Sequence, residues 1–533
     1  MNTTSRTLGN TRKWGTFVIC ALLALVPNVD LTALNLAIPH LTADLNPSAG
    51  QILWIADAYG FALAGLLITM GGVGDRIGHR RLLLIGTALF GATSVLTAYA
   101  GTAEILIAAR FLLGVAGATL MPSGLSLIRR AFTDSKERTM AIGAFMGIGG
   151  LAVGLGPVAG GALLNHFWWG SVFLINVPVM LAVLVAGPFV LPESSRRGRP
   201  GRLDLVSVPL SVAGTLGLVY AVKEAAAGGD LGTGVLAPAA GGLVALAAFA
   251  WRQSRLDEPL LDLGLFRRIA FTGSVLTGMF AMFALVAQSL IFSLYFQQVL
   301  DWSPLRSGLA GLPGAVGAMA GGAALAPPLI GLLGRARVVA AGLVIAATAY
   351  ALCVVIGQDT PYWGVLVPLF LMSGVGMGMA LTVTGDTVLA TVPKERSGAA
   401  SATSETGTEL GGALGLAVLG SVLNAVYRGT IALPEGLPAG AAHAAGDSLS
   451  GAIGAAALLP ARLAGPVVDA ARDAFMHGMH AALACSAGLA AAVAVFALVA
   501  LRDVPKVIET GDEAEEVEAG TQAGTVAGTV LEK

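Results

Sequence analysis

The stretch GGVGDRIGHRR, residues 71–81, joins two long apolar runs, 50–73 and 82–101. Its glycines permit a tight turn between two helices, and Asp75 and the basic cluster can pair with the partial charges at neighbouring helix ends. Each flanking run is about as long as the ~20 apolar residues that a helix needs to cross a bilayer. The stretch therefore predicts a short turn at a membrane surface between two spanning helices.

The rest of the chain repeats this pattern of long apolar runs separated by polar turns. Of its 533 residues, 55% are hydrophobic and 12% are charged, and the mean hydropathy is +0.79. Such a composition cannot cover the surface of a soluble domain. We predict an all-α integral membrane protein with fourteen spans. The predicted spans are 14–38, 50–73, 82–101, 104–128, 139–163, 169–191, 204–222, 233–251, 270–297, 305–331, 337–357, 362–390, 400–426 and 474–501.

The positive charges alternate along this predicted topology. Cytoplasmic loops carry an excess of Lys and Arg, and an even number of spans places both termini on one side. Most of the 31 Lys and Arg residues then fall in cytoplasmic turns. The pattern predicts a multi-pass protein of the cell (inner) membrane with both termini in the cytoplasm. The exceptions are Lys223, Arg306, Arg428, Arg462 and Arg472 on the outside and Arg110 within a span.

A weak internal repeat divides the chain into two bundles. The turn RIGHRRLLLIG (76–86) resembles LLGRARVVAAG (332–342), and each opens a new helix. Many transporters are built from repeats, with the substrate site at the repeat interface. The predicted segments are a cytoplasmic N-terminus (1–13), a six-helix bundle (14–191), an inserted helix pair (204–251), a second six-helix bundle (270–501) with an external linker loop (427–473), and a disordered cytoplasmic tail (507–533).

Acidic residues inside the predicted spans are the candidates for function. An ionised carboxylate that faces lipid is costly, so each should face a partner or a water-filled cavity. A protonated acid is cheaper to desolvate than a carboxylate, so one group can hold either a proton or a cationic substrate in competition. The acids within spans are Asp30, Asp57, Asp386, Glu405 and Glu409. For Asp386, near the cytoplasmic end of its span, we expect a structural role.

Arg110 lies about two turns into the span 104–128. A charge there costs at least ~2.5–3.5 kcal/mol on insertion scales unless it is paired or hydrated. We predict that Asp30 carries a coupling proton, that Arg110 stabilises its ionised form, and that Asp57 assists Asp30 or steers the cation. The alternative is a structural ion pair that holds helices together, and the two roles can coexist.

The substrate site is expected around Glu405 and Glu409, which share one helix face at i and i+4. Glu405 is the preferred contact for a cation, while Glu409 is either a second contact or a helix-packing hydrogen-bond partner. Aromatic rings can add cation–π contacts of ~0.5–2 kcal/mol each. The other predicted lining residues are Asp57, Tyr59, Gln288, Phe292, Tyr295 and Phe296.

The stretch GIGGLAVGLGPVAGG (147–161) predicts a smooth and kinkable helix face. Small residues at regular spacing let neighbouring helices approach closely, and proline permits a bend. Plain packing alone would already account for such a face. The residues that we single out in it are Gly154, Gly156, Pro157, Gly160 and Gly161.

These motifs together resemble the major facilitator superfamily. The turn at 71–81 is similar to its signature loop, with His79 in place of a basic residue, and the matching residues are Gly71, Asp75, Arg76, Gly78 and Arg80. RFLLGVAGA (110–118) resembles the fourth-helix motif, whose Arg is linked with proton transfer. The 147–161 stretch resembles the motif that marks antiporters and exporters in the superfamily. The resemblance implies two helical bundles and alternating access.

Four further stretches resemble the fourteen-helix drug:proton antiporters, bacterial pumps for quaternary ammonium compounds, dyes and fluoroquinolones. This likeness covers almost the whole chain and implies proton-coupled export of lipophilic cations. The chain departs from the family at Gly170, where Arg is frequent, and at Ala318 and Met319, where some members carry an acid; the latter argues against divalent cations. The stretches are DLTALNLAIP (30–39), LWIADAY (53–59), FLINVP (173–178) and SGAASATSETGTELGGALGLAVLGS (397–421).

Other functional classes find little support in the sequence. Three Cys and six His are too few for a metal or disulfide framework, and no phosphate-binding loop of the Gly-rich, Lys-bearing kind is present. We therefore predict no enzyme activity, no cofactor, no metal and no nucleic acid. The expected partners are a lipophilic cation, protons and membrane lipids, with a monomeric chain. The alternatives are a dedicated exporter of an endogenous metabolite, antibiotic or lipid, and a sensor or scaffold with a degenerate transporter fold.

Overall fold

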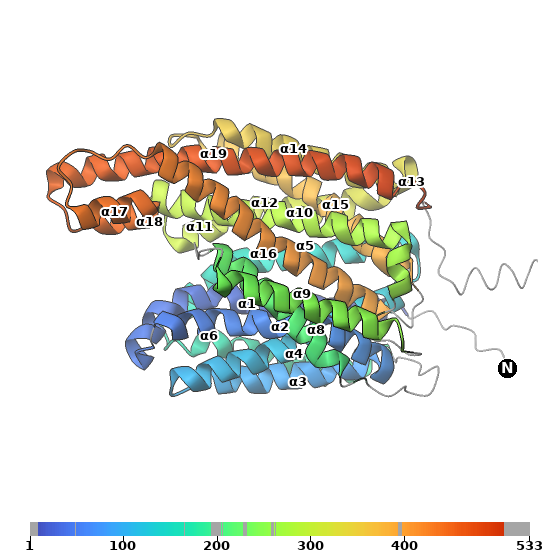
Figure 1. Cartoon of the computed structure of the whole chain (residues 1–533). Coiled ribbons are helices and arrows are strands. Elements are labelled where there is room, and N and C mark those ends of the chain that lie inside the picture. The colour runs from blue at the N-terminus through green and yellow to red at the C-terminus, as the bar shows by residue number, and fades with distance from the viewer. Residues whose placement is uncertain are drawn as a thin grey trace, which may run out of the picture.

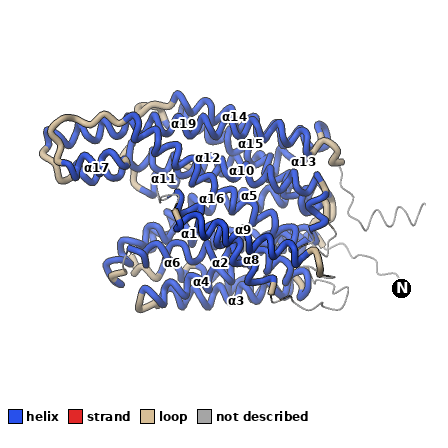
Figure 2. The backbone as a smooth tube through the Cα atoms, in the orientation of Figure 1, coloured by secondary structure: helices blue, strands red, loops and turns tan. Residues whose placement is uncertain are grey.

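The chain folds as a set of long helices that run roughly parallel to one another (Figure 1). The computed structural model describes residues 9–47, 49–164, 166–192, 204, 206–226, 232–256, 261, 263–392 and 397–505. Within these ranges every regular element is a helix, and none is a strand (Figure 2). The predicted tail at 507–533 lies outside the described residues, so its disorder stays a prediction.

The N-terminal half supplies five long helices and a sixth that is broken near its start. Ile175 separates the two pieces of this sixth helix, and the second piece begins at Asn176. The elements are α1 (Asn10–Leu45), α2 (Ala49–Ile77), α3 (His79–Ala98), α4 (Ala103–Ala131), α5 (Ser135–Leu164), α6 (Ser171–Leu174) and α7 (Asn176–Val190). The inserted pair follows as α8 (Ser207–Ala226) and α9 (Thr233–Gln253).

The C-terminal half contains the same kind of helices, several of them interrupted by short π or 3-10 turns. Its elements are η1 (Leu263–Arg267), α10 (Ile269–Leu294), η2 (Tyr295–Val299), α11 (Pro304–Ala310), α12 (Leu312–Met319), η3 (Ala320–Leu325), α13 (Ala326–Leu333), α14 (Arg335–Leu352), η4 (Cys353–Val355), η5 (Tyr362–Leu366), α15 (Val367–Ala390), α16 (Ser397–Thr430), α17 (Ala439–Asp447), α18 (Leu449–Ala456) and α19 (Ala461–Ala500).

Within the described residues, twelve helices are long and apolar enough to cross a membrane. The two remaining predicted spans correspond to α5, a helix of 30 residues, and to α8, which contributes a shorter apolar stretch at Ser207–Val222. All fourteen predicted runs therefore coincide with helical segments. The all-α membrane fold is confirmed, and the count of fourteen membrane crossings stays a prediction.

The helices form two groups that pack against each other along a common boundary. Figure 1 shows α1 to α4 on one side and α10, α14, α15 and α19 on the other, with α5 and α16 between them. Across the boundary α2 packs against α16, and α5 packs against α12 and α15. Small residues permit this approach: a Cβ on Gly71 would lie 2.4 Å from the carbonyl oxygen of Gly398, and one on Gly143 would lie 2.4 Å from the carbonyl carbon of Gly322.

The internal repeat is visible in the backbone of two turns. Gly78 connects α2 to α3 with φ 95°, and Gly334 connects α13 to α14 with φ 84°. A side chain at either position would be strained in this left-handed region. Both turns lie at the predicted cytoplasmic end, so the sequence similarity of 76–86 and 332–342 marks equivalent turns of the two bundles.

The inserted pair α8 and α9 covers one side of the boundary. Helix α8 packs against α2 of the first bundle and α16 of the second. The hydroxyls of Thr69 and Ser211 are hydrogen bonded at 3.3 Å in the buried part of this contact. The pair is joined at the same end by Asp204, just before α8, which accepts hydrogen bonds from Arg252 Nε and Nη2 at 2.6 and 2.8 Å near the end of α9.

Asp204→Asn is expected to lower the thermal unfolding temperature in detergent by a few degrees at neutral pH. Hydrogen bonds from Arg252 hold the pKa of Asp204 below its ordinary value, and Ser207 and the Val206 amide add to this. Because the folded-state pKa is depressed, the stabilisation is complete above about pH 4, the pKa of an unfolded Asp, and is lost as the pH falls through the folded value. The difference from wild type should therefore shrink below about pH 4.

The control for this prediction is Asp503→Asn, which removes an exposed carboxylate paired with its neighbour Arg502 at 3.1 Å. Its unfolding temperature should match the wild type throughout, because exposed ion pairs contribute little. Equal unfolding temperatures for Asp204→Asn and wild type at neutral pH would show that the Asp204–Arg252 contact does not stabilise the inserted pair.

The segment 427–473 is helical and packed, which corrects the linker that we expected there. It contains α17 and α18, and α19 already begins at Ala461. Tyr427 donates a hydrogen bond to the carbonyl oxygen of Ala445 at 2.7 Å, and Leu449 is buried in the core of the second bundle. Abundant Gly and Pro suggested a linker, but Ala is the strongest helix former and the prolines that flank these helices precede their first turns, where proline is tolerated.

Candidate functional site

Asp30 lies in the middle of α1 with its side chain fully buried and paired to Arg110. Arg110 Nη1 donates to Asp30 Oδ2 at 2.5 Å, and both side chains have zero exposure. Arg110 Nε donates to the carbonyl oxygen of Ile55 at 3.2 Å, which fixes the guanidinium against α2. The structure therefore brings Asp30 and Arg110 together. Charged residues within a membrane are expected to pair in this way. Their role in proton coupling stays a prediction.

Two polar residues of the site were not singled out from the sequence, namely Asn176 and Ser94. Asn176 Nδ2 donates to Asp30 Oδ1 at 3.0 Å and to Ser94 Oγ at 3.2 Å. Both residues are buried, on α7 and α3 respectively. The sequence signal that could have identified Asn176 is that it is the amide residue of FLINVP in an otherwise apolar helix. Arg110 thus donates to one carboxylate oxygen of Asp30, and Asn176 donates to the other.

Tyr59 of α2 packs against the same guanidinium. Its ring centroid lies 5.1 Å from Arg110 Cζ, within cation–π range. Two glycines of the 110–118 stretch make room for it: a Cβ on Gly114 would lie 2.3 Å from the Tyr59 carbonyl oxygen, and one on Gly117 would lie 3.0 Å from its hydroxyl. Tyr59 is 1% exposed, and its buried hydroxyl has no hydrogen-bond partner among the described residues. Tyr59 therefore lines the Arg110 side of the site.

Asp57 lies on α2, two residues before Tyr59. Its side chain is outside the described part of the structure, so its predicted roles in proton coupling and cation steering remain predictions.

Glu405 and Glu409 lie on the face of α16 that is turned toward the first bundle. Gly398 and Ala402 meet Gly71 of α2, and steps of three and four residues continue the same face to Glu405 and Glu409. Glu405 is half-buried, and Glu409 is exposed. Thr408 Oγ1 donates to the Glu405 carbonyl oxygen at 2.8 Å and lies 3.5 Å from its carboxylate.

The two acidic centres are linked through Tyr59. The charges of Asp30, Arg110 and Glu409 all act on its phenol. Helices α2 and α16 pack together along this length. The site therefore has one ion pair buried inside the first bundle, with Tyr59 packed against its guanidinium, and a pair of glutamates at the boundary of the bundles.

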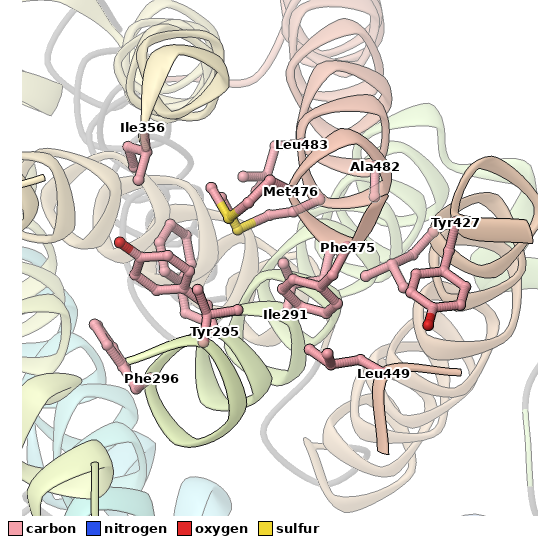
Figure 3. Packing of buried hydrophobic residues seen from close by; sticks show 14 of the residues in the cluster. Ile291, Tyr295, Phe296, Ile356, Tyr427, Leu449, Phe475, Met476, Ala482 and Leu483 are labelled. Atoms are coloured by element: carbon pink, nitrogen blue, oxygen red, sulfur yellow. The ribbon is translucent and has the colours of Figure 1, made fainter. Parts of the chain in front are cut away.

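The predicted aromatic lining lies elsewhere in the structure. Phe292, Tyr295 and Phe296 are at most 3% exposed and belong to the hydrophobic core of the second bundle. Figure 3 shows Tyr295 and Phe296 gathered with residues of α19 that include Met476. Tyr295 donates to the carbonyl oxygen of Gly357 at 2.9 Å. In this conformation these three side chains are packing residues, and their contact with a substrate stays a prediction.

Gln288 is also buried, between α10 and α15. Its amide nitrogen lies 3.4 Å from Ser373 Oγ, at the long end of hydrogen-bond range. It therefore joins two helices of the same bundle here, and its predicted contact with a substrate is likewise untested.

The signature turn ties the two bundles together at the predicted cytoplasmic end. Asp75 accepts hydrogen bonds at 2.9 Å from the backbone amides of both Gly398 and Ala399, at the N-terminus of α16. A carboxylate is favoured there by the unpaired N–H groups and the helix dipole. Arg80 donates to the carbonyl oxygen of Pro188, and Arg76 Nη1 donates to that of Gly72 at 3.3 Å.

Asp386 forms a second tie at the same end. It accepts hydrogen bonds from Arg138 Nε at 2.7 Å and Thr139 Oγ1 at 3.0 Å, both on α5 of the first bundle. Arg335 Nη2 of α14 lies 2.8 Å from Asp386 Oδ2, the same oxygen that accepts from Thr139. All three charged side chains are at most 1% exposed. The structural role expected for Asp386 is therefore an ion cluster that joins the bundles.

The glycine-rich face of α5 contacts helices of both bundles. A Cβ on Gly160 would lie 3.1 Å from Ala33 Cβ of α1, and one on Gly147 would lie 2.1 Å from Met319 Cγ of α12. Gly156 is buried, while the position of Gly161 has space for a Cβ. Gly154 and Pro157 lie within α5, and their local packing is outside the described part of the structure. The face is thus a packing surface at the boundary.

The sequence matches known proteins over most of its length. Residues 20–416 match the family model of the Major Facilitator Superfamily. The chain is 42% identical over 500 residues to the multidrug efflux pump LfrA of Mycolicibacterium smegmatis, covering 94% of this chain and 98% of the relative. It is 34% identical to the methyl viologen resistance protein SmvA of Salmonella typhimurium, covering 91% and 97%.

Two further comparisons extend this set. The chain is 32% identical to the tetracenomycin C resistance and export protein of Streptomyces glaucescens, with 91% of each chain covered. The crystal structure of the human organic anion transporter MFSD10 (TETRAN) matches with a TM-score of 0.59, covering 91% of this chain and 99% of that chain. At 14% identity this likeness shows the fold alone.

Two helical bundles that meet around buried charges define a multi-pass membrane transporter rather than an enzyme. The chain belongs to the Major Facilitator Superfamily.

Proposed function

We propose that the protein exports lipophilic cationic drugs in exchange for protons. The observation that carries the proposal is the pairing of Asp30 with Arg110 at 2.5 Å inside the first bundle. The two glutamates on the face of α16 turned toward that bundle supply further negative charge for a cation. Three relatives over most of the chain are described as a multidrug efflux pump and as resistance or export proteins. Methyl viologen, which gives one of them its name, is itself a cation, although it carries two charges and not one.

In the proposed cycle the bundles rock about the site at their boundary. A lipophilic cation enters from the cytoplasm or inner leaflet and binds against Glu405 and Glu409. Protonation of Asp30 from outside weakens its attraction to Arg110, so the guanidinium is freer to act on Tyr59 and on the charge beyond it. Each proton that moves inward contributes about 2.3 kcal/mol per 100 mV of membrane potential, besides the pH gradient.

The proposed setting is the inner cell membrane, with both termini in the cytoplasm and a single chain as the working unit. The bundles are proposed as 14–191 and 270–501, with 204–251 as the inserted pair. The clustering of Arg76, Arg80, Arg138 and Arg335 at one end of the helices supports this orientation. Quaternary ammonium compounds and dyes are the proposed cargo class, with fluoroquinolones as a further candidate.

Glu405→Gln is expected to reduce the apparent affinity for a monovalent lipophilic cation by about tenfold or more, because hydrogen bonds to charged groups contribute about 1.5–3 kcal/mol. Transport of a neutral drug of similar size should change little. The measurement is uptake of fluorescent substrates into inverted vesicles, with Glu409→Gln tested in parallel. Glu104→Gln, an exposed carboxylate on the first turn of α4, is the matched control.

A dedicated exporter of an endogenous compound is the second candidate. The similarity to a tetracenomycin resistance and export protein favours it. In that case neutral or anionic cargo would be carried equally well by wild type and Glu405→Gln, and no lipophilic cation would compete with it.

A further inference from the structure

The amide of Asn176 has one unused hydrogen-bonding atom beside Asp30. Its nitrogen donates to Asp30 Oδ1 at 3.0 Å and to Ser94 Oγ at 3.2 Å. Its oxygen is buried and has no hydrogen-bond partner among the described residues, although the residue is only 1% exposed. A buried polar atom without a partner is costly. The arrangement seen here therefore satisfies the amide only in part.

The orientation of this amide is set by the ionised form of Asp30. A carboxylate can only accept hydrogen bonds, so the NH2 group must face it. A protonated carboxyl is different, because it carries a donor. Oδ2 is paired with the Arg110 cation at 2.5 Å, whereas Oδ1 accepts only from the neutral amide of Asn176 at 3.0 Å. A proton is therefore expected on Oδ1, the atom that faces Asn176.

We propose that Asn176 is a positioning residue that changes its hydrogen bond with the protonation state of Asp30. With Asp30 ionised, the amide nitrogen donates to Oδ1. When a hydronium ion delivers its proton to Oδ1 and leaves as water, the amide rotates by half a turn, and its free oxygen accepts from the new O–H. The inference rests on the proposed proton coupling and extends it to a residue on α7.

Ser94 is suited to both arrangements. Its hydroxyl can act as donor or acceptor. It accepts from the amide nitrogen in the present structure and can donate to the amide oxygen after rotation. Asp30, Asn176 and Ser94 thus keep hydrogen bonds to one another in either protonation state, and each state has a defined geometry at Asp30.

A pH effect at Asp30 must be separated from the titration of its charged and titratable neighbours. From the packed helices, Arg110 of α4 and Tyr59 of α2 face it. On α5, Glu137 is paired with Lys13 and Arg138 with Asp386, near the first turn of that helix, with Lys136 beside them. The side chain of Asp57 on α2 is not described, so the experiments below carry an Asp57→Asn background as a parallel series.

The first experiment measures the pH dependence of proton-driven cation uptake by the full-length chain in proteoliposomes. Asn176→Leu removes both hydrogen bonds at similar volume. Because a charge-assisted hydrogen bond is roughly twice as strong as a neutral one, the ionised form loses more, and the pH midpoint should rise by up to about 1 unit. Ser94→Ala should shift it in the same direction by less. The control Thr97→Val removes a buried hydroxyl that bonds only within α3, to Thr93, and should leave the midpoint unchanged.

The second experiment is difference infrared spectroscopy of the carboxylic C=O stretch on acidification, with Asp30→Asn identifying the Asp30 band. In wild type the band should have the lower frequency of an acid that donates a hydrogen bond, and in Asn176→Leu it should move to higher frequency. A band at the same frequency in both proteins would overturn the proposed acceptor role.

The outcomes separate this inference from the function on which it rests. If Asp30→Asn transports and responds to protons normally, the proposed proton coupling fails. If Asp30→Asn loses coupling while Asn176→Leu keeps both the wild-type midpoint and the wild-type band, the coupling stands and the role of Asn176 is overturned. If the Asn176→Leu protein does not fold, Ser94→Ala decides the question. Its carboxylic C=O band is then compared with that of the control Thr97→Val.

Discussion

Replacing Asp30 by Asn is expected to abolish the response of cation transport to the proton gradient. One proton exchanged per substrate supports about tenfold accumulation for each pH unit across the membrane, since 1.4 kcal/mol corresponds to a factor of ten. Without a titrating group at this position the accumulation ratio of a fluorescent cation in inverted vesicles should fall to the value seen with a protonophore. Substrate binding at Glu405 should persist.

The variant also leaves Arg110 without its carboxylate, which typically costs about 3–5 kcal/mol for a buried pair. Thermal unfolding must therefore be measured beside transport, and Asp30→Glu, which restores a carboxylate, should recover part of the coupling. Asp44→Asn is the control on the same helix, because this exposed carboxylate accepts a hydrogen bond from Trp169 Nε1 at 2.8 Å near the end of α1. A proton-driven accumulation by Asp30→Asn equal to wild type would remove Asp30 from the mechanism.

Much of the Asp30 site could be predicted because intramembrane charges are rare and must find partners. Asp30 and Arg110 are charged residues within apolar runs. Their similar predicted depth in the membrane was enough to predict that they interact. Asn176 and Ser94 carry no charge, so their burial in a membrane costs less and their presence was less conspicuous. Only the three-dimensional packing of α7 and α3 behind α1 shows that they touch the same carboxylate.

The aromatic residues that would line the substrate site could not be predicted from the sequence. The few polar residues of the run 270–297, such as Ser274, Gln288 and Ser293, do not form a continuous polar face that would mark the side turned toward the site. Phe292, Tyr295 and Phe296 were chosen as candidates for their chemistry, and the structure places them in a hydrophobic core. Glu405 and Glu409 were easier, because two carboxylates at i and i+4 define one face without knowledge of the neighbours.

The segment 427–473 was misjudged for a related reason. Composition alone does not distinguish an Ala-rich linker from Ala-rich helices, and position decides the effect of proline. Pro438 and Pro460 immediately precede α17 and α19, where proline starts helices instead of breaking them. The buried contact of Tyr427 with Ala445, between α16 and α17, could not be seen from composition.

Asp386→Asn is the second change for which we expect a large effect, at the predicted cytoplasmic end of the helices. The carboxylate of Asp386 neutralises part of the positive charge of Arg138 in the first bundle and of Arg335 in the second. Removing its charge leaves two guanidinium groups buried with insufficient compensation, so we expect a loss of about 3–5 kcal/mol in stability. Arg138 of the first bundle contacts Asp386 of the second. The substitution should therefore weaken the contact between the bundles and open the predicted cytoplasmic end.

The opening can be measured with a cysteine reporter at Ala141, which is buried on α5 one turn beyond Arg138. In a Cys485→Ser background, a membrane-impermeant maleimide added to inverted vesicles should label Ala141→Cys faster when Asp386→Asn is present. Asp301→Asn is the control, because its pair with Arg472 at 2.5 Å lies in a different turn and is exposed. Equal labelling and equal unfolding temperatures with and without Asp386→Asn would show that the Asp75 contacts with α16 hold this end closed without help from the buried ion cluster.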